Sequence, residues 1–178
     1  LAPRFQLDLF RLRLLTENMR SDEDYEELAS LAGQAGFADE GRRVIEEGFK
    51  AGVLGQGAKA DRHQRLKAFM DKKVADAKSG YAAAEKAARE SKQGDGLVML
   101  GLQQAFSGQA KAGVAMIQDG IRVGQLKREG DAQLALGQAL FLAGDTAKAL
   151  TAFRAAKGED GVADVAKLWA NYARTAKK

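Results

Sequence analysis

A pattern of small and apolar residues that recurs along the chain most constrains its fold. Seven residues recur in type 72 positions later: Gly36, Ala38, Gly41, Ile45, Gly48, Gly52 and Leu54 return as Gly108, Ala110, Gly113, Ile117, Gly120, Gly124 and Leu126. After another 36 positions, the pattern Gly101, Gly108, Gly113, Ile117 and Gly120 reappears as Gly137, Gly144, Ala149, Phe153 and Ala156. A spacing of 36, with 72 as its double, predicts stacked repeats that are each a pair of helices.

Composition favours helices over sheets. The chain has 34 Ala but only 15 β-branched residues, which leaves little material for strands. Apolar residues follow the helical period almost throughout. They predict helices over residues 4–19, 22–35, 38–51, 59–78, 80–92, 95–107, 110–123, 130–142, 146–157 and 161–176. The predicted fold class is therefore all-α.

The length of 178 residues suits one helical-repeat domain spanning residues 1–178. We divide it into a helix of a preceding repeat (1–21), repeats at 22–57, 58–93, 94–129 and 130–163, and a final helix at 164–178. The copy at 58–93 is degenerate, because only Ala77, Tyr81, Ala84 and Ala88 keep the register. The absence of Cys excludes disulfides and thiolate chemistry. No apolar run is long enough to predict a membrane span.

The N-terminal helix has apolar residues on two faces. One face carries Phe5, Leu9, Leu12 and Met19, and the other carries Leu7, Phe10 and Leu14. A helix that is apolar on two sides is expected to be buried on two sides. We therefore expect upstream repeats or a second copy of the chain to cover it, with Leu1 a processed end or an artificial start.

The repeats resemble the tetratricopeptide repeat family. In 130–163 the residues at signature positions are Leu136, Gly137, Leu140, Ala149, Phe153 and Ala156. Copy 94–129 matches with Leu100, Gly101, Gly113, Ile117 and Gly120, and copy 22–57 with Leu28, Ala29, Gly41, Ile45 and Gly48. Two positions depart from the family, because Gln133 replaces its first aromatic residue and Gly161 its closing proline. Small residues such as Gly137 and Ala149 are expected where two helices cross closely.

The resemblance implies a right-handed α-solenoid whose last helix caps the array. It also implies a non-catalytic scaffold that binds a protein or peptide in a concave groove. By position, the groove residues are Val98, Leu102, Phe106, Leu134, Gln138, Phe141, Leu142, Trp169 and Tyr172. Because they are mostly apolar, we expect an apolar or helical partner. The alternative is that several of them pack between repeats, as apolar stripes usually do.

The chain also resembles the C-terminal part of longer exported bacterial repeat proteins, which implies a periplasmic location. The residues themselves indicate no compartment.

Motifs for enzyme chemistry are absent or incomplete. The run Gly52–Lys59 approaches a phosphate-binding loop, but Ala60 stands where a Ser or Thr hydroxyl is required. His63 is the only histidine and lies among polar residues, so we expect it to be exposed. It has no second metal ligand at i+4, where Lys67 stands. We therefore predict no enzyme activity, cofactor or metal.

Charge clusters are interpreted as solvated helix surfaces. Acidic residues at Asp22, Glu23, Asp24, Glu26 and Glu27 suit the first turns of a helix, where the helix dipole favours them. Residues 59–92 hold ten Lys or Arg against five Asp or Glu. Such a segment could contact an anionic polymer weakly, but the interleaved acids favour a charged helix face, and we expect no nucleic-acid partner. Self-assembly through the N-terminal helix, giving a homo-oligomer, is the other alternative function.

Overall fold

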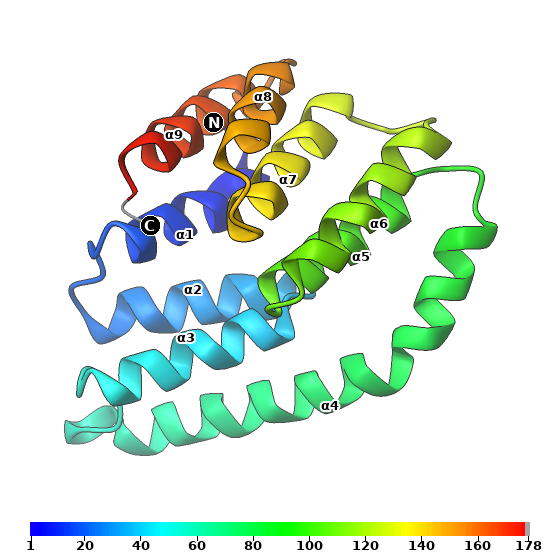
Figure 1. The fold of residues 1–178 in the computed structure, drawn as a ribbon. Coiled ribbons are helices and arrows are strands. Elements are labelled where there is room, and N and C mark those ends of the chain that lie inside the picture. The colour runs from blue at the N-terminus through cyan, green and yellow to red at the C-terminus, as the bar shows by residue number, and fades with distance from the viewer. Residues whose placement is uncertain (177–178) are drawn as a thin grey trace. The chain divides into compact units, whose positions relative to one another are not determined.

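Helices form all the regular structure of residues 1–176, the part of the chain that the computed structural model describes, and no strand occurs there. The α-helices, shown in Figure 1, are α1 (Gln6–Leu15), α2 (Asp22–Gln34), α3 (Ala38–Lys50), α4 (Ala60–Glu90), α5 (Asp95–Phe106), α6 (Ala110–Val123), α7 (Glu129–Leu142), α8 (Thr146–Ala155) and α9 (Val162–Thr175). Short 3₁₀ turns lie at Pro3–Phe5 and Gly57–Lys59. The all-α prediction is confirmed.

One predicted boundary is wrong. The sequence predicts two helices over 59–78 and 80–92, whereas α4 runs without interruption through Gly80 (Figure 1). A single glycine inside a helix costs only about 1 kcal/mol. The neighbouring residues 75–78 and 82–88 are rich in Ala and Lys, which favour the helix. The degenerate copy at 58–93 is thus one long helix and not a pair.

Three glycines at the repeat spacing end helices in the same way. Gly36, Gly108 and Gly144 follow α2, α5 and α7, and each has a positive φ, between 85° and 94°. In each case the next residue donates its N–H to a carbonyl five residues back, as Phe37 does to Ala32 at 2.8 Å. This is the Schellman motif, which favours glycine because other residues are strained at positive φ. The spacing therefore reflects repeated helix–turn units.

The contacts of the chain divide it into two compact units, where the sequence predicted one array. Unit 1 comprises Leu1–Phe5 and Ala82–Lys178, and unit 2 comprises Gln6–Tyr81. Helix α4 therefore contributes its first part to unit 2 and its last turns to unit 1.

Glycines allow close helix contacts in unit 1, where α5 packs on α6 and α7 on α8. A Cβ atom at Gly113 would lie 2.4 Å from the carbonyl oxygen of Gly101 on the facing helix. A Cβ at Gly137 would lie 2.4 Å from the ring of Phe153. Both distances are shorter than any real carbon contact, so these positions need glycine. The prediction that small residues mark helix crossings is confirmed at these three glycines.

The last helix closes the core of unit 1. Helix α9 packs on α7 and α8 and buries Trp169 completely. The Trp169 ring stacks on Phe153, with ring centres 6.4 Å apart, and meets the edge of Phe141 at the same distance. The first residues of the chain join this unit, because Ala2 donates its N–H to the carbonyl of Asp160 and Arg4 pairs with Asp131 at 2.9 Å.

Unit 2 is built on the pair α2 and α3, whose Leu28 and Ile45 are fully buried. Helix α4 adds a buried stripe of His63, Met70 and Val74. Helix α1 packs on α2. The buried residues of α1 are Leu7, Asp8 and Arg11, while the predicted apolar residues Leu9, Phe10, Leu12 and Leu14 are only half-buried. The expectation that upstream repeats or a second copy of the chain cover this helix stays a prediction.

Among residues 1–176, none of the helices combines the length and apolar character that crossing a membrane requires.

Candidate functional site

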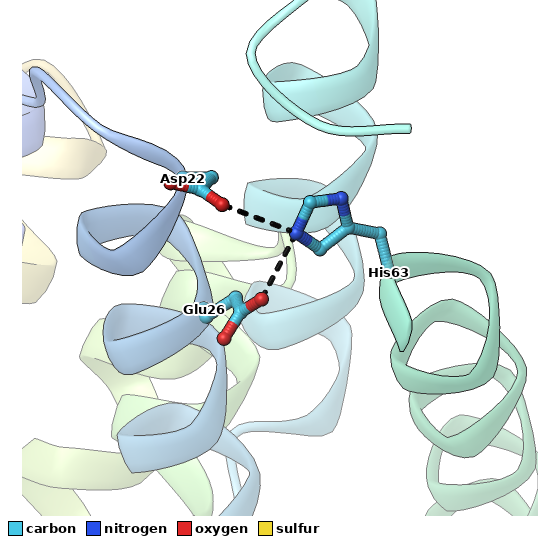
Figure 2. Close-up of side chains that lie close together, drawn as sticks. All are labelled: Asp22, Glu26 and His63. Carbon is cyan, nitrogen blue, oxygen red and sulfur yellow. Dashed lines mark ion pairs between the residues drawn. The ribbon is translucent and has the colours of Figure 1, made fainter. Parts of the chain in front are cut away.

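The first candidate is a cluster of charged side chains between α2 and α4 in unit 2. Helix α2 begins at Asp22 because Ser21 caps it: the Ser21 hydroxyl accepts the N–H of Asp24, and the Asp24 carboxylate accepts the N–H of Ser21. Asp22 and Glu26 are four residues apart and therefore share one face of the helix. Both carboxylates point toward His63 on α4 (Figure 2).

His63 is buried, with 1% of its surface exposed, and the prediction that it is exposed is wrong. Its Nε2 lies 2.9 Å from Oε1 of Glu26 and 3.6 Å from Oδ2 of Asp22 (Figure 2). Its Nδ1 accepts a hydrogen bond of 3.0 Å from the N–H of Gly55. Glu26 is also buried, at 6% exposure, so this part of the acidic cluster is not the solvated surface that the sequence predicted.

One signal in the sequence could have indicated that His63 is buried. His63, Met70 and Val74 lie seven and four residues apart, which puts them on one face of a helix. The neighbouring residues in the sequence conceal this, because Arg62 and Gln64 are polar and exposed.

Two cations neutralise the carboxylates of the cluster. Lys59 pairs with Asp22 at 2.9 Å and also with Glu23, and Arg62 pairs with Glu26 at 2.6 Å. The hydrogen bond from Lys59 is the main cause that lowers the pKa of Asp22 to about 2. The hydrogen bonds to Glu23 and Asp22 raise the pKa of Lys59 to about 12.

Asp22, Glu26 and His63 offer one nitrogen and two oxygens within 4.8 Å of one another, a set that could bind a metal ion. The hydrogen bonds argue against this use. Because Gly55 donates to Nδ1, the neutral ring carries its proton on Nε2, which therefore faces the carboxylates as a donor and not as a ligand. The Asp22 oxygen nearest the ring already binds Lys59. The cluster fits a polar contact that joins α4 to α2 and fixes the loop at Gly55.

The ion pair of Asp22 and Lys59 predicts a pH dependence of stability. The pKa of Asp22 falls from 3.8 to about 2 on folding, so its stabilising effect is complete above about 3.8 and is lost as the pH falls toward 2. The pKa of Lys59 rises from 10.5 to about 12, so its effect is lost as the pH rises through that range. Urea unfolding at several pH values measures this. Between pH 3.8 and 2 we expect a shallower loss of stability in Asp22→Asn than in the wild type. Equal slopes would contradict the assignment.

The nine predicted groove residues all lie in unit 1, and four of them are buried. Phe106, Leu134, Gln138 and Trp169 are at most 7% exposed. Val98 and Leu102 are half-buried against the core cluster of Ala105, Ile117, Ala135 and Ala139. Phe141 and Tyr172 are brought together, with ring centres 5.5 Å apart and both half-buried. Leu142 is 36% exposed and is the most accessible member of the set.

Other apolar side chains near these positions are more exposed. Met99 on α5 and Leu168 on α9 are 47% and 45% exposed. Helices α5 and α9 each pack on α7, which carries Leu142. Leu168 lies one helical turn before Tyr172 and therefore on the same side of α9. The sequence proposed residues on these helices as a binding groove, but it could not separate the exposed residues from those that form the core.

The basic segment 59–92 is partly neutralised. Lys67 pairs with Asp71 at 3.2 Å, and Arg89 with Glu85 at 2.7 Å, each one helical turn apart. The glycine-rich run before it forms a turn and the short 3₁₀ segment Gly57–Lys59 that lead into α4. Within this run Leu54 is 2% exposed and packs beside Gly48. A packing role explains it without a phosphate.

A second buried charged group was not predicted. Arg11 of α1 is 4% exposed and binds Glu40 of α3 through two hydrogen bonds of 2.8 and 2.7 Å. It also binds Asp8 at 3.1 Å and lies over the ring of Phe37. Burial by itself lowers the pKa of Arg11, but the charges and hydrogen bonds of Glu40 and Asp8 outweigh it and raise the pKa.

Comparison of the chain with protein families, with curated proteins and with solved structures finds no match.

Proposed function

We propose that the protein is a non-catalytic interaction scaffold that binds an apolar or helical peptide on the face of unit 1 formed by α5, α7 and α9. The observation that carries this proposal is the exposure of Met99, Leu142 and Leu168, one on each of these helices. Large apolar side chains exposed on neighbouring elements are typical of interaction sites.

The arrangement of helices supports the proposal. Contacts pair α5 with α6 and α7 with α8, and they join α5, α7 and α9 in a row. In a right-handed solenoid of tetratricopeptide type, the first helix of each pair lines the concave side, and here those helices are α5, α7 and α9. The residue pattern of copies 94–129 and 130–163 favours the same architecture.

Aromatic residues of α7 and α9 support the face. Phe141 packs edge to face against Tyr172 and against Trp169, which is fully buried. An apolar partner residue placed on Leu142 or Leu168 would therefore meet a surface held in place by the core. Preorganised surfaces of this kind lose little conformational entropy on binding.

A double substitution of exposed residues tests the proposal. Leu142→Glu with Leu168→Glu places two charges on the face, and the fold should survive because both side chains already reach solvent, at 36% and 45% exposure. Peptides selected from a display library on the wild type should carry apolar residues three or four apart. We expect the double variant to bind them at least about tenfold more weakly. Fluorescence anisotropy measures the affinity.

Val123→Glu is the matched control, because Val123 is 43% exposed but lies on α6, outside the proposed face. It should bind the selected peptides like the wild type. If no peptide is enriched, or if all three proteins bind equally, the proposed face is wrong. Phe141→Glu is unsuitable as a test, because it would also disturb the contacts with Trp169 and Tyr172.

A further inference from the structure

Helix α4 exposes an aromatic side chain that the core does not use. Phe69 is 52% exposed, and it is the only aromatic residue among the large apolar side chains that are exposed within residues 1–176. The same helix packs into unit 2 through His63, Met70 and Val74. Phe69 is on the flank of α4, outside that buried stripe.

Basic residues surround Phe69 on the helix surface. Arg65 precedes it by one turn, and Lys72 and Lys73 follow it by one turn, so all three lie beside it. The Lys73 ammonium is 5.1 Å from the centre of the Phe69 ring. Arg65 and Lys72 are exposed and form no ion pair with any residue in 1–176. We call Arg65, Phe69, Lys72 and Lys73 the basic–aromatic stripe.

Cations outnumber acids on this side of α4. By helical spacing, Asp71 falls on the opposite side and pairs with Lys67 there, whereas Asp61 lies one turn before Arg65, near the line of the stripe. The cations that precede the stripe, Lys59 and Arg62, are already bound to acids of α2. Asp76 lies one turn after Lys72 and Lys73, so Asp61 and Asp76 are the two carboxylates of α4 near the line of the stripe. The three cations of the stripe outnumber these two carboxylates.

We propose that the basic–aromatic stripe binds an acidic amphipathic helix of a partner protein. When two helices pair, an apolar seam is flanked by charges that select the partner, and the stripe presents an apolar anchor flanked by cations. A complementary helix would place an apolar residue on Phe69 and glutamates or aspartates opposite Arg65, Lys72 and Lys73.

The course of α4 supports a helical occupant. The degenerate copy at 58–93 forms one continuous helix, so it supplies no second helix that packs on α4 as α6 packs on α5. Beyond the stripe, residues 75–80 are exposed at every position of the helix. A membrane surface would require several apolar side chains, and the stripe offers one. A single strand of nucleic acid requires successive stacking platforms, of which there is again only one.

The experiment measures binding of a synthetic acidic helical peptide, with leucines at heptad spacing flanked by glutamates, to the full chain at low and high salt. The wild type should bind it, and the affinity should fall as salt screens the charges. Phe69→Ala and Lys72→Glu should each weaken binding by about tenfold. Lys78→Glu makes the same charge change on another side of α4 and should leave binding unchanged. Circular dichroism checks that the exposed substitutions preserve the helix content.

Three comparison ligands make the outcome decisive: the same peptide with lysine in place of glutamate, a homothymidine oligonucleotide, and vesicles that contain phosphatidylserine. None of them should bind through the stripe. The proposal is overturned if the acidic peptide does not bind, if Phe69→Ala and Lys78→Glu behave alike, or if the oligonucleotide or the vesicles bind in its place. The Leu142→Glu, Leu168→Glu variant should bind the acidic peptide normally, so the two proposed surfaces can fail independently.

Discussion

Gly113→Ala is expected to destabilise unit 1 strongly, although alanine is the better helix former. The new Cβ would lie 2.4 Å from the carbonyl oxygen of Gly101 and 2.8 Å from the backbone nitrogen of Ala105. Both are backbone atoms of α5, so relief requires that α5 and α6 move apart. Overpacking of this kind typically costs about 1–3 kcal/mol, which exceeds the gain of about 1 kcal/mol in helix propensity. Amide hydrogen exchange in α5 and α6 measures the loss.

Gly80→Ala is the matched control, because it makes the same change inside a helix where a Cβ would meet no atom within 4 Å. Only the propensity gain remains, so this variant should be more stable than the wild type by about 0.5–1 kcal/mol. Changes in stability of opposite sign in the two variants would separate the effect of steric overlap from that of helix propensity. If Gly113→Ala is neutral or stabilising, α5 and α6 do not cross as closely as the structure has them.

The close helix crossings could be predicted from the sequence because they require a particular residue. Only glycine lets the backbones of α5 and α6 approach at Gly101 and Gly113, and only glycine suits the turns at Gly108 and Gly144. Such requirements leave identical residues at a constant spacing. Most helix boundaries could be predicted from the same glycines.

The uninterrupted course of α4 could not be predicted in the same way. Gly80 resembles the glycines that end other helices, but it does not have a positive φ and no turn follows it. Whether a glycine ends a helix or is tolerated within one depends on the residues that pack beyond it. A repeat pattern does not contain that information.

The candidate site residues show a second limit. A stripe of apolar residues looks the same whether it is covered or exposed, so Trp169 and Leu142 received the same role although one is buried and the other is accessible. For charged and polar residues the error is the opposite one, because the sequence favours exposure for side chains that the structure buries. His63 and Arg11 occur among polar neighbours in the sequence, and only the fold brings them to Glu26 and Glu40, which compensate their burial.

The largest effect of a charge substitution is expected at Glu40. In Glu40→Ala the Arg11 guanidinium loses two hydrogen bonds, of 2.8 and 2.7 Å, while it stays buried at 4% exposure. Asp8 remains beside the guanidinium, at 3.1 Å. Removing one member of a buried ion pair typically costs about 3–5 kcal/mol, because the other charge is left uncompensated. We expect a loss in this range, measured by hydrogen exchange in α1 and α3.

The double variant Arg11→Met, Glu40→Met shows whether the cost comes from the unpaired charge. With both partners replaced by apolar side chains of similar length, no cation is left buried, and the loss should be much smaller than in Glu40→Ala. Lys167→Ala provides the exposed comparison, because its pair with Asp164 is 75% and 68% exposed and should contribute less than about 1 kcal/mol. If Glu40→Ala costs no more than Lys167→Ala, the Arg11 network does not hold α1 to α3. If the double variant is as unstable as Glu40→Ala, the loss arises from packing against Phe37 and not from charge.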